Sequence, residues 1–159
     1  MHAVSILRII LCILLCMAAG WIGSLATRDA IPQWYAGLTK PSFSPPNWAF
    51  GVVWPILYVL MGIALATVLS AGMDRKEVLI AATVFGIQLA LNAAWSLIFF
   101  GLHRIDWALV EIVVLWLAIL MTAYLFYRVS TVAAALLVPY LLWVSFAIGL
   151  NAGFWRLNP

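Results

Sequence analysis

Residues 78–102 read VLIAATVFGIQLALNAAWSLIFFGL and contain no charged side chain. A helix rises 1.5 Å per residue, so a helical run of this length crosses the roughly 30 Å hydrocarbon core of a bilayer. Lipid cannot hydrogen-bond a bare backbone, and the run is too long and too evenly apolar for a barrel strand. It therefore predicts a transmembrane helix.

Similar runs recur along the chain. No charge falls in 9–27, 41–73 or 129–155, and only Glu111 interrupts 107–127. We therefore predict five transmembrane helices near 5–26, 48–70, 78–102, 106–127 and 131–155. Because the later connections are short, successive helices must be antiparallel neighbours. The predicted fold class is an all-α integral membrane protein, a single five-helix bundle that occupies 1–159.

The composition agrees with a membrane protein that has no soluble domain. Of 159 residues, 67% are hydrophobic and 8% charged, against roughly half and a quarter in an ordinary soluble domain. The net charge of +3 comes from basic residues placed singly at helix ends, where they reach lipid headgroups. No basic patch for nucleic acid is present. The basic residues divide equally between the two sides, so the positive-inside rule gives no orientation and the sequence does not name the membrane.

The first predicted span has an alternative interpretation as a signal peptide. Arg8 precedes an apolar stretch, and Ser24-Leu25-Ala26 resembles a small-residue cleavage site. The apolar run is longer than the hydrophobic region of an ordinary signal peptide. A transmembrane helix is therefore the favoured interpretation.

The connection 27–47 is the longest in the chain. It carries prolines at positions 32, 41, 45 and 46 and aromatic residues that include Trp34, Tyr35 and Phe43. Proline excludes helix and stiffens the backbone, and this composition is unlike that of disordered segments. We predict an ordered loop that forms a lid over one end of the bundle. The alternative is that its aromatic residues belong to an interfacial belt.

The predicted helix 78–102 has two distinct faces. Small residues form a stripe along one of them, at Ala82, Gly86, Ala90 and Ala94. Such a stripe lets a second helix approach closely. The amides of Gln88 and Asn92 and the rings of Trp95 and Phe99 lie opposite, and polar groups in lipid seek the bundle interior.

Aromatic faces occur on two further helices. Phe50, Trp54, Tyr58 and Met61 share a face of the second helix; Pro139, Tyr140, Trp143, Phe146, Ala147, Leu150 and Asn151 share one of the fifth. An apolar, aromatic-lined space with a few polar atoms suits a large, flat, hydrophobic ligand. Simple packing of one helix against another is the alternative for each residue.

The remaining polar residues indicate no catalytic or metal centre. Glu111 is the only acid at membrane depth, and its place near a helix end predicts that it reaches the interface. His2 and His103 have no ligand cluster beside them, so neither a zinc nor a haem site is predicted. No serine, histidine and acid converge.

Three blocks of sequence share aromatic, proline and amide residues. The first is Trp34-Tyr35-Ala36-Gly37-Leu38, with Lys40-Pro41, Pro45-Pro46, Trp48, Trp54 and Leu57-Tyr58. The second runs from Gln88-Leu89 through Asn92 and Trp95 to Phe99-Phe100-Gly101, and the third is Val138-Pro139-Tyr140-Leu141 with Trp143, Phe146-Ala147 and Leu150-Asn151. These blocks resemble the translocator protein family, called tryptophan-rich sensory proteins in bacteria and peripheral-type benzodiazepine receptors in animal mitochondria. The chain looks like a bacterial-type member.

The resemblance implies a five-helix bundle, commonly a homodimer, with a cavity beneath the first loop. In the family this cavity binds porphyrins and, in animal members, cholesterol and synthetic isoquinoline or benzodiazepine-type ligands. By motif it implies a set of ligand-binding residues, namely Trp34, Tyr35, Trp54, Asn92, Trp95, Trp143, Phe146, Ala147 and Leu150. We expect a receptor or sensor that binds porphyrin as a ligand, with no cofactor, and that transports or regulates tetrapyrroles. By the same analogy the Ala82 to Ala94 stripe is the expected homodimer interface, because it faces away from the amides.

Two features qualify these expectations. The family's sterol motif places a tyrosine where Ala152 stands, four residues before Arg156, which puts sterol binding in doubt. Some bacterial members are described as promoting light-dependent breakdown of porphyrin, with tryptophans that match Trp54 and Trp143, so this enzymatic activity is an alternative function. A subunit that organises other membrane proteins is a further alternative.

Overall fold

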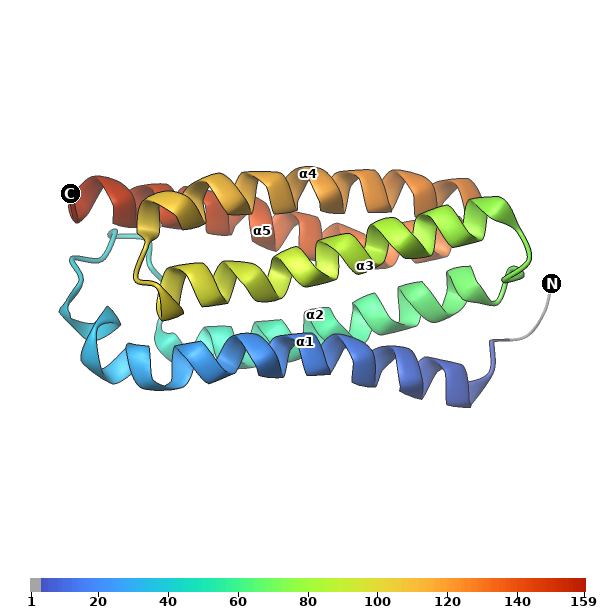
Figure 1. The fold of residues 1–159 in the computed structure, drawn as a ribbon, viewed down its shortest axis with the longest axis horizontal. Helices are drawn as coiled ribbons and strands as arrows, with labels where there is room; N and C mark the ends of the chain where they lie inside the picture. The colour runs from blue at the N-terminus through green and yellow to red at the C-terminus, as the bar shows by residue number, and fades with distance from the viewer. Residues whose placement is uncertain (1–3) are drawn as a thin grey trace.

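The structure, a computed structural model that describes residues 4–159, is a bundle of five long helices (Figure 1). They are α1 (Ile6–Gln33), α2 (Asn47–Leu69), α3 (Lys76–Ser96), α4 (Ile105–Val129) and α5 (Thr131–Leu157). A 3-10 turn, η1 (Tyr35–Gly37), lies in the first loop, and a π-helical turn, η2 (Leu97–Gly101), continues α3. Five helices are long and apolar enough to cross a membrane, with η2 counted as part of the third. The predicted all-α membrane fold is confirmed.

The helices form a ring in which each has two main neighbours. α1 packs against α2 and α3, α4 packs against α3 and α5, and α2 also packs against α5. The order around the bundle is therefore α1, α2, α5, α4, α3. The first loop and the C-terminus lie at one end of the bundle, while the α2–α3 turn lies at the other end (Figure 1).

The first helix is longer than predicted, and the first loop is correspondingly shorter. α1 continues to Gln33, with Pro32 inside its last turn, instead of ending near residue 26. Beyond the proline, the Trp34 N–H still donates to the Ala30 carbonyl oxygen at 2.9 Å. The predicted end was wrong because Arg28 and Asp29 mark where the apolar run stops, whereas the helix itself extends past them. The other helix ends differ from the predicted positions by only one or two residues.

The half of the bundle away from the first loop is packed solid. Met61 and Ala66 of α2 and Ala81 of α3 are fully buried there. The rings of Phe85 in α3 and Phe126 in α4 stack with their centroids 5.7 Å apart. This half is a continuous core that holds the helices in place.

Glycines allow α1 and α2 to approach each other closely. A Cβ atom on Gly62 of α2 would lie 2.5 Å from the Cα atom of Ile13 in α1, closer than real Cβ contacts come. A Cβ atom on Gly20 of α1 would overlap the ring of Tyr58 in α2. Because the Gly62 contact is with backbone, it cannot be relieved by rotating a side chain.

We expect Gly62→Ala to lower the free energy of unfolding in detergent by about 1–3 kcal/mol, the usual cost of overpacking. Its matched control is Gly149→Ala in α5, where no other atom lies within 4 Å of the new methyl group. The control should unfold at or above the wild-type midpoint, because alanine favours helix over glycine. If thermal unfolding showed that both variants lose the same stability, the close approach of α1 and α2 at Gly62 would be contradicted.

Candidate functional site

The half of the bundle next to the first loop is hollow. A cavity of about 550 Å³ lies between the helices there, within the roughly 300–1,000 Å³ typical of small-molecule sites. All five helices, the π-helical turn and Tyr35 of the first loop contribute to its wall. The fold therefore encloses a space of ligand size within the transmembrane region.

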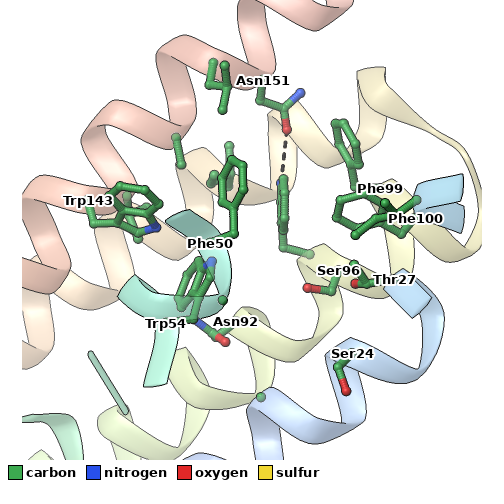
Figure 2. A pocket seen from close by; sticks show the side chains of 18 of the residues that line it. Ser24, Thr27, Phe50, Trp54, Asn92, Ser96, Phe99, Phe100, Trp143 and Asn151 are labelled. Atoms are coloured by element: carbon green, nitrogen blue, oxygen red, sulfur yellow. Dashed lines mark hydrogen bonds between the residues drawn. The ribbon is translucent and has the colours of Figure 1, made fainter. Parts of the chain in front are cut away.

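Ten aromatic residues line the cavity, and several of them are drawn in Figure 2. The ring-bearing residues are Phe50, Trp54, Tyr58, Trp95, Phe99, Phe100, Trp143 and Phe154, together with Trp21 of α1 and Tyr35 of the loop. Trp95 stacks on Phe99 with centroids 5.1 Å apart, and Phe50 meets Trp143 edge to face at 6.0 Å. These contacts hold the rings around the space, so they can present faces to a flat apolar ligand.

The π-helical turn brings two consecutive rings to the cavity. The Leu102 N–H donates to the Leu97 carbonyl oxygen at 2.9 Å, five residues back instead of four. As a result both Phe99 and Phe100 line the cavity. Such wide turns inside helices are frequent at functional sites. The sequence predicted a regular helix through residue 102 and did not indicate this turn.

A chain of buried hydrogen bonds lies at the inner end of the cavity. The Tyr58 hydroxyl donates to Asn92 Oδ1 at 2.7 Å, and Asn92 Nδ2 donates to the Tyr140 hydroxyl at 2.9 Å. Tyr140 in turn donates to Gln88 Oε1 at 2.8 Å. Gln88 is only 1% exposed. The prediction that both amides face the bundle interior is confirmed, and the chain fixes the orientation of Asn92 at the cavity wall.

A second set of hydrogen bonds positions the ring of Trp95. Its indole Nε1–H donates to Asn151 Oδ1 at 3.0 Å, drawn as the dashed line in Figure 2. Asn151 Nδ2 donates to the Ile105 carbonyl oxygen at 3.1 Å. These bonds join α3, α4 and α5 at one level and hold the ring of Trp95 at the cavity wall.

Most of the sequence-predicted site residues line this cavity, namely Tyr35, Trp54, Asn92, Trp95, Trp143, Ala147 and Leu150. Trp34 and Phe146 do not. Trp34 stacks on His103 with centroids 4.4 Å apart, while Phe146 meets Phe43 and lines a separate groove outside α2 and α5. Phe146 therefore lies on the side of α5 that faces this groove.

The wall contributed by α1 was not predicted. Its members are Met17, Gly20, Trp21, Ser24, Thr27 and Ile31. Gly20, Ser24, Thr27 and Ile31 recur at helical spacing, and this run of small and polar residues within an apolar helix was the available signal. Because the predicted helix ended near residue 26, Thr27 and Ile31 were not recognised as part of this face.

The first loop is an ordered lid attached to the end of α5. The Thr39 N–H donates to Asn158 Oδ1 at 2.9 Å, and Asn158 Nδ2 donates back to the Thr39 carbonyl oxygen at 3.0 Å. A Cβ atom on Gly153 of α5 would lie only 2.6 Å from the ring of Pro41, so the loop packs tightly on the helix there. Beneath the lid, Tyr35 packs against the rings of Phe100 and Phe154, and burial raises the pKa of its hydroxyl, which stays protonated at neutral pH.

Glu111 does not reach the membrane interface as predicted. Both of its carboxyl oxygens are buried, and neither has a hydrogen-bond partner among the described residues. The side chain lies in the second turn of α4 and is not part of the cavity wall. The prediction was wrong because nearness to a helix end does not give a short side chain a path out between packed helices.

Comparison with known proteins agrees along nearly the whole chain. Residues 12–156 match the model of the TspO/MBR family. A tryptophan-rich protein TspO from Chlorobaculum tepidum is 49% identical over 98% of both chains. The CrtK protein of Rhodobacter capsulatus is 40% identical over 91% of this chain and 88% of its own. Human translocator protein is 42% identical over 87% of this chain and 82% of its own.

We expect Tyr140→Phe to lower the free energy of unfolding by about 1–3 kcal/mol, because it leaves Asn92 Nδ2 and Gln88 Oε1 buried without their partner. Tyr127→Phe, at a position 60% exposed, is the matched control and should change stability by less than about 0.5 kcal/mol. Thermal unfolding in detergent gives both values. If the Tyr140→Phe variant were as stable as the control, the buried hydrogen bonds of Tyr140 would contribute nothing to stability.

Proposed function

This chain belongs to the TspO/MBR family, and from that membership we propose that it is a membrane receptor or sensor that binds a porphyrin, or a similar flat hydrophobic ligand, inside its helix bundle. Relatives named tryptophan-rich sensory protein and translocator protein support the receptor or sensor role. A ligand held in such a cavity can be sensed, sequestered or passed on.

The observation that carries the proposal is the aromatic cavity beneath the lid. A macrocycle has two broad apolar faces, and aromatic side chains bind such faces in stacked or edge-on arrangements. Trp54 and Trp143 stand on different helices and line the same space. Neither indole N–H donates to another described residue, so both can bond an acceptor atom on the edge of a ligand. These features support a flat, largely apolar ligand such as a tetrapyrrole.

Detergent-purified protein titrated with protoporphyrin IX should show saturable quenching of tryptophan fluorescence. Trp54→Ala and Trp143→Ala should each weaken binding by about tenfold, equivalent to about 1.4 kcal/mol, because each removes a ring from the wall. The matched control is Trp155→Ala, half exposed at the end of α5 and outside the cavity, which should bind like the wild type.

Two results would count against this assignment. Failure of the wild-type protein to bind protoporphyrin IX saturably would overturn the proposed function. Equal affinities in all three alanine variants would overturn the assigned site, because the ligand would then bind elsewhere in the protein.

We further propose that the stripe of Ala82, Gly86, Ala90 and Ala94 contacts a second copy of the chain. Gly86 and Ala90 are exposed and Ala82 and Ala94 half-buried. No other atom lies within 4 Å of the position of a Cβ atom on Gly86. Small residues on an outward helix face let two membrane helices pack at short distance.

Replacing Gly86 and Ala90 together with leucine should convert the dimer to monomer in chemical crosslinking, because bulky side chains keep the two helices apart. Gly149→Leu, on the exposed face of α5, is the control and should leave crosslinking unchanged. Protoporphyrin IX binding should survive in both variants, since neither alters the cavity. Crosslinked dimers that persist in the double variant would place the contact on another helix.

A further inference from the structure

The residues that line the cavity differ in exposure according to the helix that carries them. The exposed ones are Met17, Trp21, Ser24, Asn47, Gly51 and Pro55. All six belong to α1 or α2. The lining residues of α3, η2, α4 and α5, together with Tyr35 of the lid, are buried or half-buried. The cavity is therefore open along the seam between α1 and α2.

This opening lies at the depth of the lipid chains. Met17, Trp21 and Ser24 fall within the charge-free run 9–27, and Gly51 and Pro55 within 41–73. Trp21 is 65% exposed, and it precedes Arg28 by about 10 Å along the helix axis at 1.5 Å per residue. Residues at this depth face hydrocarbon rather than water.

The seam is closed in one half of the bundle and open in the other. Away from the lid, Gly62 of α2 packs directly against the backbone of Ile13 in α1. At Gly51 no other atom lies within 4 Å of the position that a Cβ atom would take. The Gly62 contact thus seals the far half, whereas the surface at Gly51 is open.

The route through the lid is closed by several independent contacts. Thr39 and Asn158 exchange two hydrogen bonds, and Pro41 lies tightly over Gly153. Tyr35 is 5% exposed beneath the loop. A ligand that arrived from water would have to break these contacts, whereas one that arrived from lipid at the seam would break none of them.

We propose that ligands enter and leave the cavity sideways, from the bilayer, through the seam between α1 and α2, while the lid stays closed. This inference rests on the proposed function. It defines the ligand class further: the protein takes molecules dissolved in the membrane rather than free in water. The exposed ring of Trp21 and the surface at Gly51 form the two sides of the passage.

The test measures binding rates of protoporphyrin IX to full-length protein in lipid nanodiscs by stopped-flow tryptophan quenching. Gly51→Trp adds a large ring at the seam, at a position where a Cβ atom meets no other atom within 4 Å. It should slow association and dissociation together by about tenfold, with a smaller change in Kd, because an obstructed passage affects both directions. Trp21→Ala widens the passage and should speed both rates.

The matched control is Gly37→Trp in the lid, which is also exposed and also has no other atom within 4 Å of the new Cβ atom. It should leave both rates as in the wild type. Slower exchange in Gly37→Trp together with unchanged rates in Gly51→Trp would overturn the inference in favour of the lid. Saturable binding with wild-type rates in both seam variants would also overturn it and leave the proposed function intact. Absence of binding in the wild type would instead overturn the proposed function.

Discussion

The structure depends first on the inability of lipid to hydrogen-bond the backbone. Each crossing must satisfy its own N–H and C=O groups, which makes every span a helix and leaves only short connections outside it. The same constraint acts on side chains. Tyr58, Asn92, Tyr140 and Gln88 bond one another in the bundle interior. Polar residues thus fix the order and rotation of the helices around the cavity.

Residue size then divides the bundle into a solid half and a hollow half. Away from the lid, Gly62, Ala64, Ala66 and Ala81 let helix backbones come close, and the space between them is filled. Near the lid, rings such as Trp54, Trp95 and Trp143 keep the helices apart. Rigid rings held by neighbours and by hydrogen bonds cannot collapse into the centre, so space remains between them. The cavity follows from this contrast.

Lid, cavity and seam form one functional unit. The lid is attached to the end of α5 through Asn158, and the core contacts press α1 against α2 at the opposite end. Between these two fixed ends, the cavity wall is exposed along α1 and α2. With the proposed entry route, this arrangement keeps a ligand away from water and lets it exchange with the membrane.

The sequence by itself determined the five crossings and the inward faces of α2, α3 and α5, because charge gaps and helical periodicity follow directly from lipid depth and helix geometry. Residue pattern also indicated the ordered lid.

Only the tertiary structure decided that α1 continues past Arg28, that η2 turns both Phe99 and Phe100 inward, and that Phe146 and Trp34 lie outside the cavity. It also decided that Glu111 is buried and that the wall opens between α1 and α2. These features depend on how neighbouring helices are spaced and rotated, which is set by contacts between residues distant in sequence, such as Gly62 with Ile13 and Asn151 with Trp95.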